Sequence, residues 1–118
     1  MGKSFALRAV AASLLLAVGA CTRPIPEIGR GLSQKVPEGQ DAFDKRIKAR
    51  FRIGSASNDM VEVLREQGFE ESSYPQERFR TLDYRNGGFP VHTLWSVRWR
   101  EEQGRVTEVW GVFGPTGP

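Results

Sequence analysis

Two segments of the chain carry apolar residues at helical spacing. In the first segment, Phe43, Ile47 and Phe51 recur every four residues while charged residues occupy the positions between them. This spacing predicts an amphipathic helix. The helix is expected to end near residues 50–52, ahead of Gly54.

The second predicted helix begins within residues 55–59, where the hydroxyl of Ser55 or Ser57 is expected to cap the free backbone N–H groups. Its apolar side is formed by Met60, Val61, Val63 and Leu64. Gly68 stands where a left-handed C′ residue is favoured, and Phe69 follows at C″. This order predicts a Schellman end with a hydrophobic contact back to Leu64.

Three later segments have the composition and alternation of β-strands. The predicted strands are 79–85, 91–100 and 105–113. A turn at 86–88 and a hairpin loop at 101–104 are expected to join them as antiparallel neighbours. The stretch 70–78 is predicted to be a connection because Pro75 argues against a central strand there. The five residues after the last strand are expected to be loose.

The 91–100 strand alternates between two sets of side chains. The set expected to face the core is Val91, Thr93, Trp95, Val97 and Trp99. The set expected on the other face is His92, Leu94, Ser96, Arg98 and Arg100. In the last strand, Val109 and Trp110 are adjacent, so they face the core together only with a bulge, for which Gly111 is the predicted site.

This order of elements predicts an α+β domain over residues 41–118. Two N-terminal helices are expected to pack on a three-stranded antiparallel sheet (ααβββ), which buries one face of the sheet and leaves the other face available. The expected core includes Phe43, Ile47, Met60, Leu64, Phe69, Trp95, Val97 and Trp99.

The N-terminus has the pattern of an export leader. Two basic residues precede the apolar run 9–18, and Gly19 and Ala20 lead to Cys21, the only cysteine of the chain. The run is shorter than the about 20 apolar residues that a transmembrane helix needs. Residues 1–20 resemble a bacterial lipoprotein signal peptide, which implies that signal peptidase II cleaves between Ala20 and Cys21 after a diacylglycerol is attached to the thiol. The alternatives are an ordinary secretory leader that leaves a free thiol and a buried core helix.

Residues 21–40 are expected to form a lipidated N-terminus and a flexible tether. The stretch 22–40 contains three prolines and three glycines and shows no hydrophobic periodicity. Pulled straight, it would reach about 60–65 Å. The alternative is that it docks on a partner as a short extended segment through Ile25, Ile28, Leu32 and Val36.

The charge of the exported part is close to neutral. Two of the 17 basic residues lie in the leader, which leaves 15 basic residues against 14 acidic ones. Nucleic-acid binding draws much of its affinity from an excess of positive charge. The composition therefore argues against a nucleic-acid partner.

Candidate chemistry for catalysis or metal binding is sparse. Every scheme with a histidine base must use His92, the only histidine, and a lone cysteine and histidine do not form a structural zinc site. No glycine-rich phosphate loop is present in the sequence. We therefore expect a non-enzyme with no cofactor and no metal.

The run RIGSASNDMVEVLREQGF, followed by WSVRW, a glycine turn and VTEVWGVF, resembles the BamE/SmpA/OmlA family of small outer-membrane lipoproteins. The matching positions, within about residues 43–113, are Ile53-Gly54, Met60, Leu64, Gly68 and the Trp95–Phe113 hairpin. Ala56 falls where the family usually has a capping threonine, so a neighbouring serine is expected to cap the helix instead.

The resemblance implies a non-catalytic adaptor that binds another envelope protein. Thr22 after the lipidated cysteine favours the periplasmic face of the outer membrane, if the host is Gram-negative. The expected partner contacts are His92, Arg98 and Arg100, on the sheet face opposite the helices, since arginine suits carboxylate recognition; an exposed edge strand is the alternative contact. The alternative function is a lipid-anchored inhibitor or ligand-binding module acting on an envelope hydrolase, because β-lactamase inhibitory proteins have a related architecture.

Overall fold

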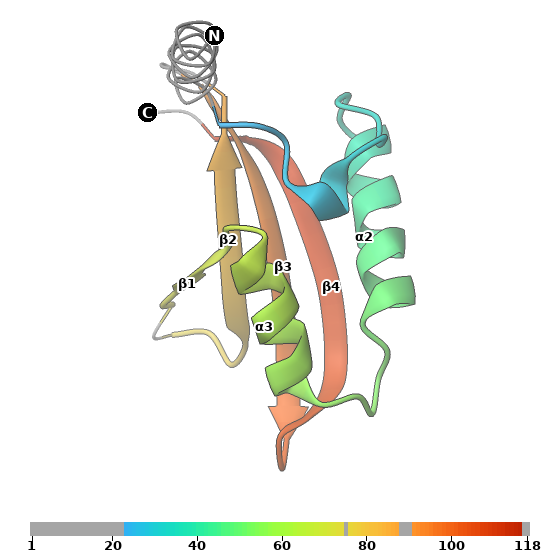
Figure 1. The fold of residues 1–118 in the computed structure, drawn as a ribbon, viewed down its shortest axis with the longest axis vertical. Helices are drawn as coiled ribbons and strands as arrows, with labels where there is room; N and C mark the ends of the chain where they lie inside the picture. Colours follow the sequence, from blue (N-terminus) through green and yellow to red (C-terminus); the bar gives the residue numbers. More distant parts are fainter. Residues whose placement is uncertain (1–22, 75, 88–90, 117–118) are drawn as a thin grey trace, which may run out of the picture.

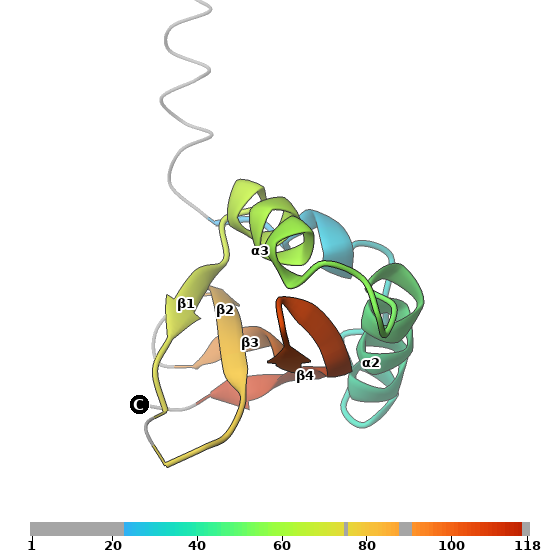
Figure 2. The same cartoon turned by 90° about the horizontal axis from the view of Figure 1, so that it is seen from below.

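The computed structural model describes residues 23–74, 76–87 and 91–116, which form an antiparallel sheet covered on one side by helices (Figure 1). Its elements are η1 (Glu27–Gly29), α2 (Glu38–Arg50), α3 (Ser57–Glu66), β1 (Glu70–Ser72), β2 (Arg80–Asn86), β3 (His92–Glu102) and β4 (Arg105–Thr116). The helices and the N-terminal segment lie on the same side of the twisted sheet (Figure 2). The predicted α+β class is confirmed.

The sheet has four strands in the order β1-β2-β3-β4, one more than predicted. The additional strand, β1, pairs antiparallel with β2 through Glu70–Asp83, Glu71–Leu82 and Ser72–Thr81. The prediction of a connection over 70–78 is therefore wrong for residues 70–72, which form a strand. β1 is only three residues long, too short for an alternating pattern to appear in the sequence.

The predicted core is confirmed, because all eight of its residues are buried. Trp95, Val97 and Trp99 of β3 are fully buried beneath the helices, as the alternation predicts. Thr93 is only half-buried, and 49% of the surface of Val91 is exposed. The core face of β3 therefore begins at Trp95 rather than at Val91.

The helix α2 forms where the four-residue spacing predicts it, although it begins at Glu38, before residue 41. Phe43 and Ile47 are fully buried, and both lie against Gly111 of β4. A Cβ atom at Gly111 would lie 2.9 Å from Phe43 Cδ2 and 3.0 Å from Ile47 Cγ1. The absence of a side chain at Gly111 thus allows α2 to approach the strand.

The bulge predicted at Gly111 is wrong. Val109 is buried, whereas Trp110 pairs with Arg98 on the opposite face and is half-buried, so the two side chains do not compete for the core. The register shift between β3 and β4 lies instead at Arg100 and Glu101.

Side chains of α2 bind the outer backbone edge of β4. Gln40 donates from Nε2 to the Gly111 carbonyl at 2.8 Å and accepts the Phe113 N–H at 2.7 Å through Oε1. Asp44 Oδ1 accepts the Gly111 N–H at 3.0 Å. These bonds occupy backbone groups that an edge strand would otherwise leave open.

The predicted Schellman end of α3 is confirmed. Gly68 has φ +100°, the Phe69 N–H donates to the Leu64 carbonyl at 3.0 Å, and the Gly68 N–H donates to the Arg65 carbonyl at 3.0 Å. Leu64 and Phe69 are both buried in the core.

The predicted serine cap at the start of α3 is wrong. Ala56 is the N-cap residue and makes no side-chain cap. The hydroxyl of Ser57 donates to the Gly104 carbonyl at 3.1 Å, and that of Ser55 donates to the Arg52 carbonyl at 2.5 Å. Both hydroxyls are thus used as donors rather than as cap acceptors. The Ser57 bond and a β-bridge between Ala56 and Arg105 join the start of α3 to the β3–β4 hairpin.

The β3–β4 hairpin is longer than predicted at both ends. Its turn consists of Gln103 and Gly104 alone, with φ angles of +52° and +76°, as a two-residue hairpin turn with two positive φ angles requires. At the other end, Gly114 to Thr116 pair with His92 to Leu94. The prediction of a loose tail after Phe113 is therefore wrong for residues 114–116, which belong to β4.

Residues 23–32 pack on the domain, whereas residues 34–37 are exposed. Ile28 and Gly29 are buried, and a Cβ atom at Gly29 would lie 2.5 Å from a ring carbon of Trp95. The Ile28 N–H donates to Gln67 Oε1 at 2.8 Å. The alternative prediction was that hydrophobic residues of this segment contact a partner. Three of them, Ile25, Ile28 and Leu32, pack instead on the chain's own core.

The start of this segment is also held. Arg23 donates to the Gly68 carbonyl at 2.8 Å, and its guanidinium lies 3.9 Å from the centre of the Tyr84 ring. The Tyr84 hydroxyl donates to the Pro24 carbonyl at 2.7 Å. The prediction of a flexible tether over 21–40, and of a domain that begins at 41, is therefore wrong for the described residues.

Candidate functional site

The face of the sheet opposite α2 and α3, which we call the far face, carries all three predicted contact residues. His92, Arg98 and Arg100 lie on alternate positions of β3, and their cross-strand partners on β4 are Thr116, Trp110 and Glu108. His92 lies at the first residue of the strand, half-buried and separated from the arginines by Leu94 and Ser96. The structure thus brings Arg98 and Arg100 together but not His92.

The two arginines are surrounded by aromatic rings from two segments, the connection between β1 and β2 and the strand β4. The Arg98 guanidinium lies 5.3 Å from the centre of the Phe79 ring and 5.7 Å from that of Tyr74, and the Arg100 guanidinium lies 5.4 Å from the Trp110 ring. Phe79 and Trp110 make an edge-to-face contact at 5.3 Å. We call these five residues the arginine–aromatic patch.

The arginine–aromatic patch is partly open to solvent. Tyr74 is 38% exposed, Arg100 is exposed and forms an ion pair with Glu108, and Arg98, Phe79 and Trp110 are half-buried. Spacing along β3 predicts the arginines. The sequence did not assign the rings to this site, because Tyr74 and Phe79 fall in or beside the stretch interpreted as a connection and Trp110 was considered for the core.

A buried polar network lies beneath the patch. Asp83 accepts hydrogen bonds from Ser72 Oγ at 2.7 Å and from Thr81 Oγ1 at 3.1 Å, and the oxygens of Thr81 and Ser96 are 3.0 Å apart. Arg98 Nε donates to Ser96 Oγ at 3.1 Å. The network therefore holds Arg98 from below while the rings flank it, which limits the conformations that Arg98 can adopt before binding.

Ser96 was expected on an open face, but it is fully buried there. Its far-face neighbours Thr81 and Asp83 are also buried, at 0% and 4% exposure. Their polar atoms bond to one another, which satisfies groups that burial would otherwise leave without partners.

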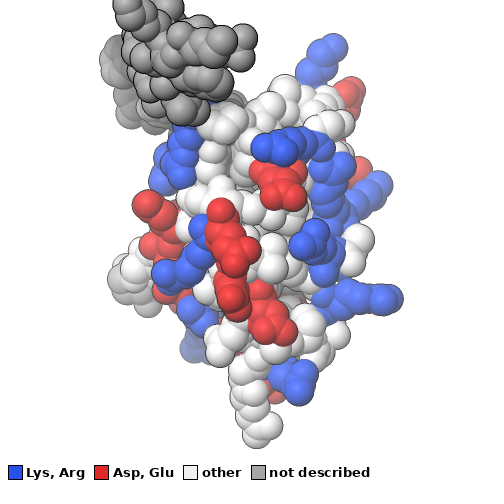
Figure 3. Space-filling model, viewed as in Figure 1, with Lys and Arg blue, Asp and Glu red and all other residues white. Residues whose placement is uncertain are grey.

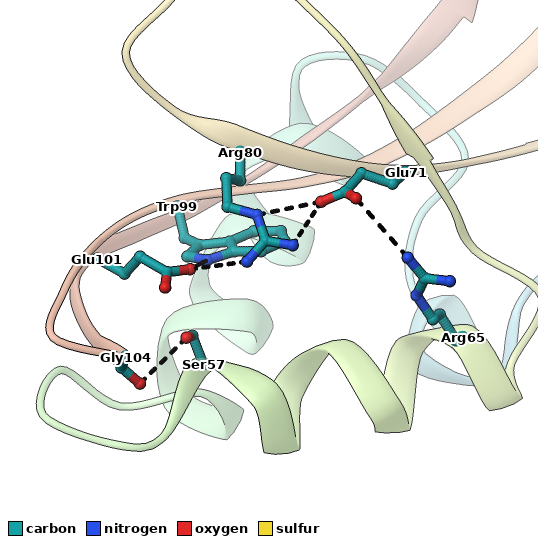
Figure 4. Close-up of polar contacts among 7 residues, drawn as sticks. All are labelled: Ser57, Arg65, Glu71, Arg80, Trp99, Glu101 and Gly104. Carbon is teal, nitrogen blue, oxygen red and sulfur yellow. Dashed lines mark hydrogen bonds and ion pairs between the residues drawn. The ribbon is translucent and has the colours of Figure 1, made fainter.

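A second polar group joins the ends of β2 and β3 on the core side of the sheet (Figure 4). Glu101 accepts hydrogen bonds from Trp99 Nε1 at 2.9 Å and from Arg80 Nη1 at 3.0 Å, and Arg80 also binds Glu71 at 2.6 Å. Arg65 of α3 lies 3.7 Å from the other Glu71 oxygen. The network links α3 to three strands.

These contacts shift two pKa values. The Trp99 N–H bond is the main reason that the pKa of Glu101 lies below its usual value, and the Arg80 bond and charge add to it. Burial alone would lower the pKa of Arg80, but the bonds and charges of Glu71 and Glu101 outweigh burial and raise it.

We expect Glu101 to contribute stability that disappears in acid. Because its pKa is lower in the folded state, the contribution is complete above the unfolded pKa of about 4.3 and is lost as pH falls through the folded value. The difference in thermal midpoint between wild type and Glu101→Gln should therefore shrink as pH falls from 7 to 3. The matched control is Glu102→Gln, since Glu102 is exposed and makes no side-chain hydrogen bond among the described residues. A Glu101→Gln difference as large at pH 3 as at pH 7 would contradict the assignment.

An open pocket of about 510 Å³ lies between the end of α2 and β4. Its apolar lining comes from Phe51, Ile53, Val109 and Trp110, and its charged lining comes from Lys48, Arg52 and Glu108. Ile53 is 72% exposed, the highest exposure among the large hydrophobic residues described. The sequence analysis assigned no binding role to this position.

Charge is segregated on the helical side of the domain. Figure 3 shows a row of acidic side chains over α3 and a group of basic ones along α2. The exposed acidic residues of α3 are Asp59, Glu62 and Glu66. Exposed basic residues of α2 include Lys45, Lys48 and Arg50. Lys45 and Lys48 form ion pairs with Asp41 and Asp44, so part of the basic charge of α2 is compensated locally.

Residues 23–74, 76–87 and 91–116 contain no group of three side chains that could together bind a metal ion. None of the described helices has the length and hydrophobicity needed to cross a membrane. The predicted cleavage and lipid-attachment residues, Ala20 and Cys21, lie outside the described residues, and their roles stay predictions.

Comparison with models of protein families, with curated proteins and with solved structures finds no match.

Proposed function

We propose that the protein is a lipid-anchored, non-catalytic adaptor that binds another envelope protein at the periplasmic face of the outer membrane. The anchor is the lipobox-like sequence that ends at Cys21. The binding role rests on the arginine–aromatic patch, which lies on the face of the sheet that the helices leave uncovered.

The composition of the patch supports a protein partner. Arginine, tryptophan and tyrosine are the residues most enriched among those that dominate binding energy at protein interfaces. Arg98 is held by Ser96 and by two rings, so less side-chain entropy would be lost when a partner orders it. Arg98 and Arg100 favour a partner surface that carries carboxylates.

The alternative is an inhibitor or ligand-binding module that acts on an envelope hydrolase. The observation that favours it is the pocket beside Phe51 and Ile53, which combines an apolar lining with Lys48 and Arg52. Trp110 borders both the patch and the pocket, whereas Tyr74 belongs to the patch alone and Ile53 to the pocket alone. Probes at Tyr74 and Ile53, together with the identity of the captured protein, therefore separate the two proposals.

We expect photo-crosslinking in intact envelopes to capture an outer-membrane assembly protein from the far face. A photoreactive phenylalanine analogue in place of Tyr74, which is 38% exposed, should give the product, and the same analogue in place of Asp59 on α3 serves as the matched control. Arg100→Glu should reduce the yield several-fold, because it reverses a charge of the patch. The double change Arg100→Glu with Glu108→Arg keeps the ion pair and tests whether the position of the positive charge matters.

Cys21→Ala should also reduce capture, because the domain would no longer be held at the membrane. Capture of a hydrolase, from an analogue in place of Ile53, would support the inhibitor instead. If the product from the analogue at Tyr74 is unchanged by charge reversal at both Arg98 and Arg100, the patch is not the binding surface.

A further inference from the structure

We propose that one end of the sheet lies directly against the phospholipid headgroups, so that the domain is held upright on the membrane. This strand-end surface consists of Arg23, Lys35, Val36, Arg85 and Val91. The inference rests on the lipid attachment at Cys21 proposed above. It adds the orientation of the domain relative to the membrane and the residues that face the lipid.

The first step is that the chain is fixed to the domain almost immediately after Cys21. Arg23 donates to the Gly68 carbonyl at 2.8 Å and stacks on the Tyr84 ring at 3.9 Å. The Tyr84 hydroxyl then binds the Pro24 carbonyl at 2.7 Å. Pro26 is buried, so successive residues of this segment are held as well.

The second step is a length. Two residues of chain advance from Cys21 to Arg23, and they span at most about 7 Å when fully extended. The headgroup region on each side of a bilayer is roughly 5–7 Å deep, which is half the difference between the total and hydrocarbon thicknesses. A cysteine whose lipid chains enter the hydrocarbon therefore places Arg23 at or within the headgroups.

The third step is the location of Arg23 at the end of the strands. Its Nη1 lies 3.4 Å from the Arg85 carbonyl near the end of β2, where Asn86 pairs with Thr93 of β3. The end of β4 lies here too, because Thr116 pairs with the first residue of β3. Figure 1 shows the beginning of the described chain and this end of the sheet side by side.

The segment that precedes α2 reaches the same end (Figure 1). Gln40, in the first turn of α2, binds the Phe113 N–H, and Phe113 is only three residues from the end of β4. Lys35 and Val36 therefore belong to the same surface as Arg23.

The chemistry of this end suits an interface with lipid. Val36 and Val91 are 55% and 49% exposed, and together they are two of the four exposed large hydrophobic residues described. Arg23, Lys35 and Arg85 are exposed cations that can approach lipid phosphates, while Glu38 is the acidic residue next to this group in the chain. Apolar side chains flanked by cations are typical of protein surfaces that lie in the headgroup region.

This orientation fixes the height of the arginine–aromatic patch. β3 runs away from the strand-end surface, so the Gln103–Gly104 turn lies about 35 Å farther along, at about 3.3 Å per residue. Arg98 lies six residues into the strand and thus about 20 Å from the headgroups. The partner must present its binding surface at that height.

The test uses the native lipidated protein, in which Cys21 carries lipid and an introduced cysteine is the only free thiol. Val91→Cys and Gln103→Cys proteins are labelled with a thiol-reactive fluorophore and reconstituted into phosphatidylcholine–phosphatidylglycerol vesicles that contain a headgroup nitroxide lipid. We expect quenching at position 91 to be at least threefold stronger than at position 103. Equal quenching at the two positions would overturn the orientation.

Two controls keep the outcomes distinct. Wild-type protein should take up no fluorophore, and labelling of wild type would show that Cys21 is not lipidated, in which case the proposed anchorage itself fails. Both labelled variants should keep the wild-type circular dichroism spectrum. A folded Val91→Cys protein that remains vesicle-bound and unquenched rejects the inference while leaving lipid anchorage in place.

Discussion

Trp95→Ala is expected to lower the free energy of unfolding by about 3–5 kcal/mol, a large part of the stability of so small a domain. Trp95 is fully buried, its ring centre lies 5.2 Å from that of Phe43 and 4.4 Å from that of Phe113, and Gly29 packs on its ring. The substitution therefore removes the contact shared by α2, β4 and the N-terminal segment. Denaturant unfolding followed by circular dichroism measures the loss.

The matched control is Trp110→Ala, which removes the same side chain from the far face. Trp110 is only half-buried, so its loss should cost clearly less than the loss of Trp95. An unchanged thermal midpoint for Trp95→Ala, or equal losses for the two variants, would mean that the core is not centred on Trp95.

Gly111→Ala is expected to lower the free energy of unfolding by about 1–2 kcal/mol, although alanine usually favours a strand over glycine. The new methyl group would lie 2.9 Å from Phe43 and 3.0 Å from Ile47, and both side chains are fully buried in the core. Overpacking typically costs about 1–3 kcal/mol, which exceeds the gain of about 0.4–1 kcal/mol from a less flexible unfolded chain.

The same strand provides the control for that change. Gly114→Ala meets no heavy atom within 4 Å of its new Cβ, so only the unfolded-state gain should remain. The two variants should therefore shift the thermal midpoint in opposite directions. A stabilising effect of Gly111→Ala would show that α2 is not packed tightly on β4.

Elements whose signals lie within a few residues are predictable from this sequence. The spacing of Phe43, Ile47 and Phe51 is enough to place α2, because periodic burial needs no knowledge of the partner surface. The end of α3 follows from Gly68 and Phe69, since the Schellman bonds reach back only as far as Leu64.

Features that depend on distant residues are not predictable in the same way. Proline and glycine in residues 23–37 suggest flexibility locally, but Gly29 is required by Trp95, 66 residues later in the sequence. Ser57, at the start of α3, has the chemistry of a cap, yet its hydroxyl donates to the carbonyl of Gly104, 47 residues later in the sequence. In both cases a contact with a residue far away in the sequence outweighs the local signal.

The candidate site shows the same division. Alternation along β3 is enough to place Arg98 and Arg100 on one face, because side chains two residues apart share a face of a strand. Their aromatic neighbours come from β4 and from the segment before β2, and which rings meet which arginine depends on strand register. Register cannot be read from a single sequence when three strands and a loop converge.

The side-chain cover of β4 has a consequence for self-association. The unpaired backbone N–H and C=O groups of a free sheet edge can pair with strands from other molecules, and stacks of such strands form fibrils. On β4, an incoming strand would have to displace Gln40 and Asp44 at Gly111 and Phe113, and it would also meet the backbone of Gly54 and Ser55 at Val106. The other edge is the three-residue strand β1, where Glu70 and Glu71 repel their counterparts in a second copy. Copies of the domain at high local concentration are thus protected against templated aggregation at both edges of the sheet.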